Sequence, residues 1–440
     1  MDLKKIICLI FCCIFIIAYS RAQTAPPMLT LKDAIEIALK NNYHIQLAKN
    51  NSTIAQNNVT PGAAGMLPVV SGAFTSTNSI QNTKQVRSDG TSATINGANN
   101  SNVSFGPNLN WTIFNGFGMF ANYDQLKQLS QYSEVAMRDT LLGTISNVMA
   151  TYFNLINQNQ QIIALKGAID ISRTQLRYAN DKYQVGRASG LDVLNAQVNL
   201  NTDTANYLTQ LQQFRSAKVQ LNQLLVRDLQ TDFSVADTIV VDEKLVLGDI
   251  LAKAQNQNPT ILLSEINKRL SEINLRQVKA TRYPQVALTS GYTVSNSKTP
   301  AGFTRTQNTN GFNYGLTASI NIFNGFNQNR LEKNAKIGIE NAQLSYKQTQ
   351  LNVEAQINDL YISYLSGLDL VKLGAKNVDI ARKNLQISLD KYKLGNITPL
   401  EIREAERNYL DAESKFFAAQ YQSKIAEITL KQLTNSIDIQ

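Results

Sequence analysis

The sequence has 440 residues and a formal net charge of +9, with 43% hydrophobic, 17% charged and 8% aromatic residues. Length alone allows two or three domains, but the small charged and aromatic fractions are unusual for a conventional soluble enzyme. The basic residues do not gather in one patch with interleaved aromatic residues, so we expect no nucleic-acid partner.

The first segment, residues 1–22, has the pattern of a secretory signal peptide. Lys4 and Lys5 precede an apolar run, and Ser20-Arg21-Ala22 places small residues at the spacing that signal peptidase requires. The alternative is an N-terminal membrane anchor, but about 13 apolar residues are too few to span a bilayer comfortably. We therefore predict that residues 1–22 are removed on export.

The mature chain, from Gln23, is expected to contain no cysteine, because Cys8, Cys12 and Cys13 all lie in the apolar run. It keeps 39 basic and 32 acidic residues, a net charge of +7, and can form no disulfide or thiolate site. No later segment has 18 uninterrupted apolar residues. The sequence thus predicts an exported protein that is soluble or forms a β-barrel.

Two motifs recur at one fixed offset, which indicates an internal duplication. The segment 113–117 (Ile-Phe-Asn-Gly-Phe) returns unchanged as 322–326, 209 residues later. The segment 181–186 (Asp-Lys-Tyr-Gln-Val-Gly) returns as 390–395 (Asp-Lys-Tyr-Lys-Leu-Gly) at the same offset. The intervening stretch is therefore one structural unit that is used twice.

The duplication defines the predicted domains. Further upstream, Leu67-Pro68-Val69-Val70 pairs with Tyr283-Pro284-Gln285-Val286 at an offset of 216, so the first copy has seven extra residues between its strand candidates. We predict a first repeat at 23–227, an inter-repeat linker at 228–245 and a second repeat at 246–440.

Each copy is predicted to follow the order helix, two strands, very long helix, helix. In the first copy the strands are expected at about 68–78 and 103–114, the long helix at about 116–185 and the last helix at about 189–226. In the second copy a short helix and a helix are expected within about 247–282, strands at about 284–295 and 312–323, the long helix at about 325–394 and the last helix at about 398–434.

The first long helix carries the apolar seam of a coiled coil. Its residues Leu141, Ile145, Val148, Tyr152 and Leu155 step by 4, 3, 4 and 3. About 70 helical residues make a rod of roughly 105 Å. Such a helix cannot bury its seam in a compact domain and must lie against neighbours of similar length.

The strand candidates alternate between apolar residues and small or polar residues. The apolar positions are Val103, Phe105, Leu109, Trp111 and Ile113 in the first copy and Phe312, Tyr314, Leu316, Ala318, Ile320 and Ile322 in the second. This pattern is typical of a strand with lipid outside and water inside, although a half-buried strand on a soluble core has a similar pattern. Four strands cannot close a barrel, so several chains must contribute.

The stretches between the paired strands are rich in Asn, Ser, Thr and Gly. We predict that Ser79–Asn102 and Ser295–Asn310 are solvent-exposed hairpin loops, the longer one partly disordered. Pro107 lies inside a strand pattern and predicts a bulge or irregular pairing there.

Together these residues resemble the TolC-like outer membrane factors, the exit ducts of bacterial efflux pumps and type I secretion systems in Gram-negative bacteria. The resemblance covers about Leu29 to Thr434 and rests on the Tyr-x-(Val/Leu)-Gly turns, the Ile-Phe-Asn-Gly-Phe strand exits, the Pro-led strands and the duplicated layout. It implies an α+β membrane protein whose three chains form a 12-stranded outer-membrane β-barrel above a long periplasmic α-helical coiled-coil tunnel.

The resemblance also implies partners: two further copies in a homotrimer, a periplasmic adaptor (membrane fusion) protein, an inner-membrane transporter of RND, ABC or MFS type, and outer-membrane lipid. The adaptor is expected to dock at the periplasmic tips, which the resemblance places at Val185, Gly186, Leu394 and Gly395. A Gly after a helix is also an ordinary left-handed cap, and both interpretations can hold together.

An entrance gate is the second site that the resemblance implies. Glu401 and Glu404 fall on two acidic positions that narrow and charge the entrance in the family, so three chains would bring six carboxylates together. The alternative is that Glu401 completes a capping box with Thr398 and that Glu404 is a solvated residue near Arg403 and Arg407.

A tip latch is the third implied site, in which Tyr392 bonds to Asp192. The family member that suggests it has an Arg two residues after the second turn glycine, where this chain has Ile397. The salt-bridge part of the latch is therefore missing. The first-repeat tip also has capping-box spacing, from Ser189 to Asp192.

Trp111 suits the aromatic belt at a membrane interface, or alternatively a packed position between barrel and tunnel. The resemblance implies that the linker joins a belt around the middle of the tunnel.

An enzyme is not expected. His44 is the only histidine, the mature chain has no Cys, and the sequence has no metal-ligand cluster, P-loop or dinucleotide fingerprint, so we expect no cofactor. Two hypotheses remain: a transport conduit in the outer membrane, and a structural coiled-coil scaffold of the periplasm or cell surface that transports nothing.

Overall fold

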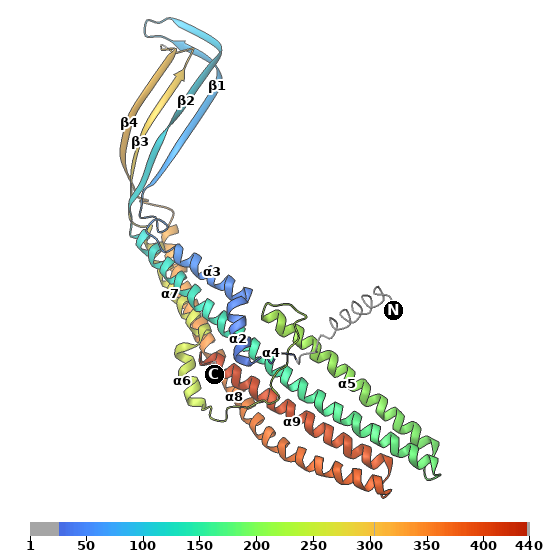
Figure 1. Cartoon of the computed structure of the whole chain (residues 1–440). Coiled ribbons are helices and arrows are strands. Elements are labelled where there is room, and N and C mark those ends of the chain that lie inside the picture. Colours follow the sequence, from blue (N-terminus) through green and yellow to red (C-terminus); the bar gives the residue numbers. More distant parts are fainter. Residues whose placement is uncertain (1–25, 303, 438–440) are drawn as a thin grey trace, which may run out of the picture. The chain divides into compact units, whose positions relative to one another are not determined.

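The computed structural model describes residues 26–302 and 304–437 (Figure 1). The predicted signal peptide, residues 1–22, lies outside them. The chain divides into two compact units, each built from both repeats. Within the described residues we call them the helical unit (up to Gln46, Thr140–Asn258 and from Glu354 onward) and the strand unit (Leu47–Asp139 and Pro259–Val353).

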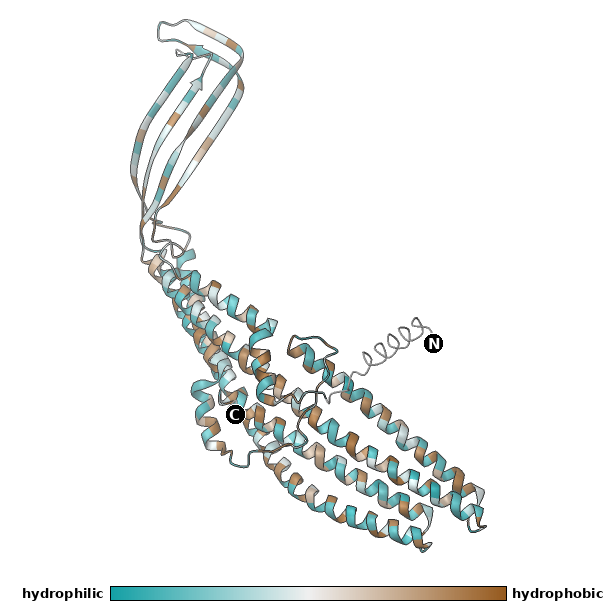
Figure 2. Cartoon of the chain, in the orientation of Figure 1, coloured by the Kyte–Doolittle hydropathy of each residue, from teal (hydrophilic) through white to brown (hydrophobic). Residues whose placement is uncertain are grey.

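The strand unit holds one antiparallel sheet in the order β1-β2-β3-β4 (Figure 1). Its strands are β1 (Val69–Val86), β2 (Ser92–Asn115), β3 (Gln285–Lys298) and β4 (Thr306–Ser319). Hydrophobic and hydrophilic residues alternate along these strands (Figure 2).

The register gathers the apolar positions of all four strands on one side of the sheet. Phe74 pairs with Phe105, Phe105 pairs with Val294, and Tyr292 pairs with Phe312. Since side chains alternate between faces, this side also carries Val70, Val103, Leu109, Trp111, Leu288, Tyr314, Leu316 and Ala318. The other side carries mainly Ser, Thr, Asn, Gly and Ala.

The prediction of long hairpin loops is wrong. Most of Ser79–Asn102 and Ser295–Asn310 is strand, and β1 and β2 pair as far as Val86 and Ser92. The ladder is made by backbone N–H and C=O groups, so paired polar residues extend it once the register is set. The prediction relied on apolar alternation, which ends earlier than the ladder.

The last predicted residues of the fourth strand are not strand either. β4 ends at Ser319, which pairs with Gln285, whereas the prediction continued to residue 323. At the equivalent end of β2, Trp111, Thr112, Phe114 and Asn115 pair with β3, with a register shift at residue 113. Within the described residues β4 has no second neighbour, so residues 320–323 lack the partner that orders the end of β2.

Irregular pairing at Pro107 is confirmed on one side of β2. Pairing with β3 lapses between Phe105 and Asn108, while Pro107 keeps its regular partner Gly72 in β1. A Cβ atom at Gly106 would stand 1.8 Å from the Tyr292 carbonyl oxygen, so the backbones approach too closely for any side chain.

The Ile-Phe-Asn-Gly-Phe motif is a strand-to-helix turn in each copy. In the first copy Gly116 and Phe117 both have left-handed φ angles, 68° and 67°. The Asn115 side chain accepts a hydrogen bond from the Met119 amide at 2.9 Å, and the rings of Phe114 and Phe117 meet edge to face at 5.2 Å. The Asn thus caps the helix that the Gly allows to begin.

The second copy repeats this turn almost atom for atom. Gly325 and Phe326 have φ angles of 66° and 62°, and Asn324 accepts from the Gln328 amide at 3.3 Å. The rings of Phe323 and Phe326 meet edge to face at 5.4 Å. The repetition of the motif therefore encodes a repeated backbone geometry.

The helices are α2 (Leu31–Asn41), α3 (Tyr43–Asn57), α4 (Gly118–Gln184), α5 (Gly190–Leu224), α6 (Leu247–Gln257), α7 (Pro259–Ala280), α8 (Asn327–Leu394) and α9 (Pro399–Leu433). None of the described helices is both long enough and apolar enough to cross a membrane.

The predicted seam of α4 lies in the core of the helical unit. Ile145, Val148, Tyr152 and Leu155 are buried, and Leu141 is half-buried. The four buried residues belong to one apolar cluster with residues of α2, α5, α9 and the linker, including Ala34, Ile35, Leu221, Phe233 and Ile428. The seam prediction is confirmed at these four positions.

Equivalent polar contacts tie each short helix to the long ones. The buried Asn42 side chain donates to the Leu224 carbonyl at 3.0 Å, and Asn258 donates to the Leu433 carbonyl at 3.0 Å. Asn42 and Asn258 are 216 residues apart, and Leu224 and Leu433 are 209 apart. The two offsets found in the motifs thus also describe the three-dimensional contacts.

Two tyrosine hydrogen bonds also recur at the offsets of 209 and 216 residues. Tyr152 donates to the Leu29 carbonyl at 2.9 Å, and Tyr361 donates to the Leu245 carbonyl at 3.2 Å. Each hydroxyl fixes the extended segment that precedes a short helix.

Both repeats end in the same turn, but with different residues in its left-handed position. Val226 and Asn435 each have φ 51°. The next amides, of Arg227 and Ser436, bond back to carbonyls five residues earlier at 3.2 and 2.9 Å. Asn tolerates this conformation, whereas a β-branched residue is strained in it.

We expect Val226→Asn to raise the free energy of unfolding by about 1 kcal/mol, because it relieves a left-handed β-branched residue. Asn435→Val is the reciprocal variant and should lower it by a similar amount. Denaturant unfolding of the purified protein measures both. Shifts of the same sign in the two variants would show that backbone strain is not the cause.

Candidate functional site

The two tips of the helical unit are built alike. Gly186 and Gly395 have φ angles of 70° and 81°. The amides of Arg187 and Asn396 bond back to the carbonyls of Lys182 and Lys391 at 2.7 and 2.9 Å, which is the Schellman arrangement. The predicted left-handed caps are therefore confirmed.

Apolar side chains next to these turns face solvent. Val185 is 68% exposed, Leu394 76% and Leu400 78%. Exposed large apolar residues that gather at one place mark contact surfaces. The tips therefore combine a rigid reversal of the chain with apolar side chains that are mostly exposed in the single chain.

Capping boxes open the helices that follow both tips. Asp192 Oδ2 accepts from the Ser189 amide at 3.0 Å and hydroxyl at 2.9 Å. Glu401 Oε2 accepts from the Thr398 amide at 2.7 Å and hydroxyl at 2.9 Å. These hydrogen bonds from Thr398 lower the pKa of the Glu401 carboxyl.

The two predicted gate residues differ in their surroundings. Glu401 takes part in its capping box, and the exposed Glu404 pairs with Arg407 at 2.9 Å. Both side chains lie on the solvent side of α9 in the single chain. Neither contact prevents a carboxylate ring in an assembly, so the gate stays a prediction.

The predicted latch residues come near each other without a direct bond. Tyr392 is buried, and its pKa is raised by that burial and by the charge of Asp192. The described contacts of Tyr392 are with Lys182, whose ammonium lies 4.5 Å from the ring centre, and with Tyr178 edge to face. The Asp192 carboxylate is used in its cap, so the latch stays a prediction.

Ile397, which stands where the resemblance suggested an Arg, adds apolar packing. It lies against the cluster of Leu385, Tyr392, Ile402 and Ala405. The second tip is therefore stabilised by apolar contact in the single chain.

A buried charged cluster lies farther along α9, and the sequence analysis missed it. Arg403 binds Asp203 through two nitrogens at 2.7 and 2.9 Å, and Glu406 at 3.2 Å. Asp203 and Glu406 are 2% and 0% exposed. The signal in the sequence was Asp203, an acidic residue on the inner face of a helix with otherwise uncharged neighbours.

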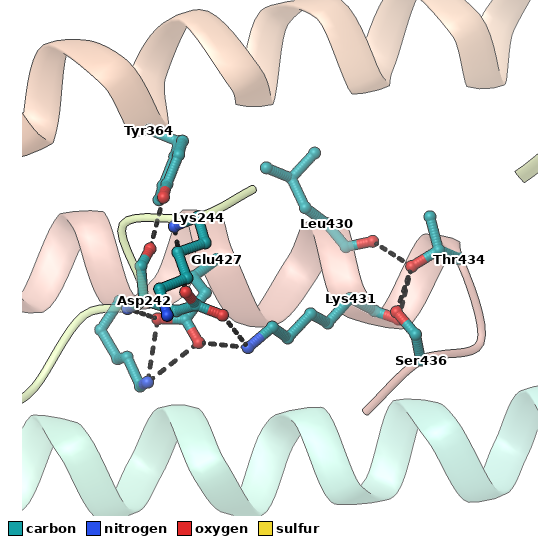
Figure 3. A network of polar contacts seen from close by, with 9 residues as sticks. Asp242, Lys244, Tyr364, Glu427, Leu430, Lys431, Thr434 and Ser436 are labelled. Carbon is teal, nitrogen blue, oxygen red and sulfur yellow. Dashed lines mark hydrogen bonds and ion pairs between the residues drawn. The ribbon is translucent and has the colours of Figure 1, made fainter. Parts of the chain in front are cut away.

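The inter-repeat linker is fixed by a second polar cluster (Figure 3). Glu427 is 2% exposed and accepts from the Asp242 amide at 2.9 Å. It also pairs with Lys424 at 2.9 Å and Lys431 at 2.8 Å. Tyr364 donates to the Asp242 carbonyl.

The charges in this cluster support one another. Burial works against the Lys431 ammonium, but the hydrogen bonds and charges of Glu427 and Asp242 outweigh it and raise the pKa of Lys431. A hydrogen bond from the Lys244 amide and another from Lys431 lower the pKa of the Asp242 carboxyl. The linker is thus held by a satisfied network and not by apolar contact alone.

Trp111 lies on the apolar side of the sheet and is 36% exposed. Its indole nitrogen donates to the Met66 carbonyl at 2.9 Å. This bond fixes the ring orientation, and the membrane-interface position stays a prediction. His44 is exposed. Between residues 26 and 437, leaving out 303, no group of three or more His, Cys, Asp or Glu could hold a metal ion.

The fold is that of outer-membrane channels. The Campylobacter jejuni CmeC outer membrane channel superposes with a TM-score of 0.79 at 18% identity, covering 92% of this chain and 85% of the other. The structure of CusC gives a TM-score of 0.75 at 19% identity and covers 94% and 95%.

Comparisons of sequence agree with these comparisons of structure. The family model for outer membrane efflux proteins matches residues 34–226 and 250–436. The outer membrane protein TolC of Salmonella enteritidis is 20% identical over 351 residues, which are 78% of this chain and 71% of that protein. The cation efflux system protein CusC of Escherichia coli is 22% identical over 318 residues, 71% and 69% of the two chains.

The chain belongs to the outer membrane efflux protein family. The resemblance to TolC-like outer membrane factors is thereby confirmed, together with the outer-membrane location and the class of function, the exit duct of efflux systems.

We expect Glu427→Ala to lower the free energy of unfolding by about 3 kcal/mol, because it leaves Lys424 partly buried without a carboxylate and Lys431 with Asp242 alone. The linker at 228–245 should then be cut faster by protease. Glu243→Ala is the matched control, because the Glu243–Lys372 pair at 3.6 Å is exposed and worth little. Equal effects of the two variants would contradict this role of Glu427.

Proposed function

We propose that three copies of this chain form a 12-stranded barrel in the outer membrane, continuous with a periplasmic helical tunnel. The tunnel carries substrates out of a tripartite efflux pump or type I secretion system and catalyses no reaction. The observation that carries the proposal is that the two halves of the sheet obey the repeat offsets. In the hairpins, Val69 pairs with Asn110, and their equivalents Gln285 and Ser319 also pair.

The β2–β3 contact joins the two copies inside one chain, so the same contact can join β4 to β1 of the partner subunit. Trp111 pairs with Leu288, and Asn110 pairs with Thr289. The offsets of 209 and 216 convert the second pair into Ser319 with Ala73 of the partner subunit. This register also keeps the apolar side continuous from β4 to β1.

The two edge strands of the sheet support its closure into a barrel across subunits. Within the described residues β1 and β4 each pair with one strand only, and long unpaired edges favour pairing with another chain. Closure into a barrel removes them. The exposed apolar side, including Phe74, Phe312 and Tyr314 at 71%, 67% and 80%, then faces lipid, with Trp111 at the interface.

The two strand-to-helix turns also support the contact between subunits. A Cβ atom at Gly116 would stand 2.1 Å from the Ala280 carbonyl oxygen, so the first turn is packed against the second copy. At Gly325 nothing in the described chain lies within 4 Å. The equivalent turn is therefore open where a neighbouring subunit would be.

The helical unit exposes apolar stripes that suit neighbouring coiled coils. Leu373, Ile380, Ile387 and Leu394 of α8 repeat every seven residues and are all more than half exposed. We propose that subunits pack along such stripes, and that the tips at Val185, Gly186, Leu394 and Gly395 dock a periplasmic adaptor. The adaptor would connect the duct to an inner-membrane transporter of RND, ABC or MFS type.

A disulfide tests the barrel. The double variant Ala73→Cys with Ser319→Cys should form disulfides between subunits and yield a covalent trimer on a non-reducing gel, because directly opposed residues lie within disulfide reach. The mature chain has no other Cys.

The matched control is Ala73→Cys with Ala318→Cys, whose side chains are expected on opposite faces. Absence of the trimer band from the first pair, or equal bands from both pairs, would overturn the proposed register.

The gate is tested by replacing Glu401 and Glu404 with Gln. Gln at the third helical position still suits a capping box, so the variant removes charge and preserves the cap. Single-channel recordings should show reduced cation preference and weaker block by divalent cations, because the carboxylate ring is lost.

Glu243→Gln, in the linker, is the control and should leave selectivity unchanged. Unchanged selectivity in the tip variant would return Glu401 and Glu404 to capping and surface roles. A purified trimer that conducts no ions would favour the scaffold hypothesis.

A further inference from the structure

The buried cluster around Arg403 joins three helices of the helical unit. α4 supplies Ser172 and Gln175, α5 supplies Asp203, and α9 supplies Arg403 and Glu406. All except Arg403 are at most 4% exposed. The cluster thus connects the α4–α5 hairpin of the first repeat to the last helix of the second.

The contacts leave no carboxylate in this cluster without a partner. Arg403 donates hydrogen bonds to Asp203 through two nitrogens and also donates to Glu406. Gln175 donates to Glu406 at 3.1 Å. The Ser172 hydroxyl lies against both acids, donating to Asp203 and standing 3.4 Å from Glu406 Oε1.

The charges, however, do not balance. One guanidinium serves two carboxylates, and an uncompensated charge in such a position is costly. The charged groups that face Glu406 are Arg403 on α9 and Asp203 on α5, while α4 presents only neutral Ser172 and Gln175. On α8, Arg382 is directed to Tyr409 and Glu413 instead.

The duplicated architecture does not require this cluster. At the repeat offset, Asp203 corresponds to Ala412, Arg403 to Leu194 and Glu406 to Gln197. The equivalent positions of the other copy therefore carry none of these charges.

We propose that Glu406 holds a proton while α9 is packed against the α4–α5 hairpin, and that loss of this proton loosens that packing. With one proton the cluster is neutral, and without it a net negative charge is buried. Burial raises the pKa of the Glu406 carboxyl, and Arg403 opposes this only in part.

The direction of the pH dependence follows. A group whose pKa is higher in the folded state contributes stability that is complete below the unfolded pKa and is lost as pH rises through the folded pKa. The α9 interface should therefore be tightest in mild acid. Glu406 lies five residues after Glu401, so loosening of the α9 interface would also loosen the proposed entrance. Only this consequence rests on the proposed function.

Infrared difference spectroscopy of the full-length mature protein tests the proton directly. In mild acid the wild type should show the carbonyl band of a protonated carboxylic acid, which decreases on titration to alkaline pH. Glu406→Gln should remove the Glu406 component of this band. Glu413→Gln is the matched control, because Glu413 is another buried α9 carboxyl with a raised pKa, and it should leave the Glu406 component in place.

Amide hydrogen exchange of α9 tests the packing. Wild type should lose protection relative to Glu406→Gln as pH rises, since Gln imitates the protonated acid at every pH. Comparison of the two proteins at each pH cancels the chemical pH dependence of exchange.

No titrating band in the wild type, a band of undiminished amplitude in Glu406→Gln, or identical protection of the two proteins at all pH values would overturn the proposal. These outcomes do not depend on channel activity or on the covalent trimer.

Discussion

The apolar seam of α4 is the contact on which the helical unit depends. A helix of 67 residues presents more apolar surface than it can cover by itself, and each buried aliphatic side chain contributes about 1.5–3 kcal/mol. Val148 and Leu155 are fully buried because α2, α5, α9 and the linker converge on them. The shorter helices are thus positioned by the need to cover the apolar surface of α4.

Apolar burial alone does not fix how far one long helix slides along another, because it is non-directional. Directional contacts supply that register. The amides of Asn42 and Asn258 bond to the carbonyl ends of α5 and α9, and Tyr152 and Tyr361 hold the segments before the short helices. Their recurrence at the repeat offsets indicates that each copy carries its own means of alignment.

The sequence was sufficient for features set by local or periodic rules. The seam at Ile145 to Leu155 follows from helical spacing, and the caps at Gly186 and Thr398 follow from residue type. The length of β1 could not be predicted this way, because Ser79 to Val86 are strand through pairing with β2 and not through their own pattern. The partnership of Arg403 with Asp203 was equally inaccessible, since 200 residues separate them and no local rule connects them.

Differences between the two copies are more informative about function than their similarities. Duplication requires equivalent turns and strand registers, and the chain keeps the strand-to-helix turns, the Asn and Tyr contacts and the base of each hairpin. It doesn't require Ile397 at the second tip, or Asp203, Arg403 and Glu406 beneath it. A symmetric bundle would resist opening equally at every helix pair. At the second tip α9 has apolar packing, and next to it lies an interface whose strength depends on charge. Movement of α9 is therefore easier to control than movement of the other helices.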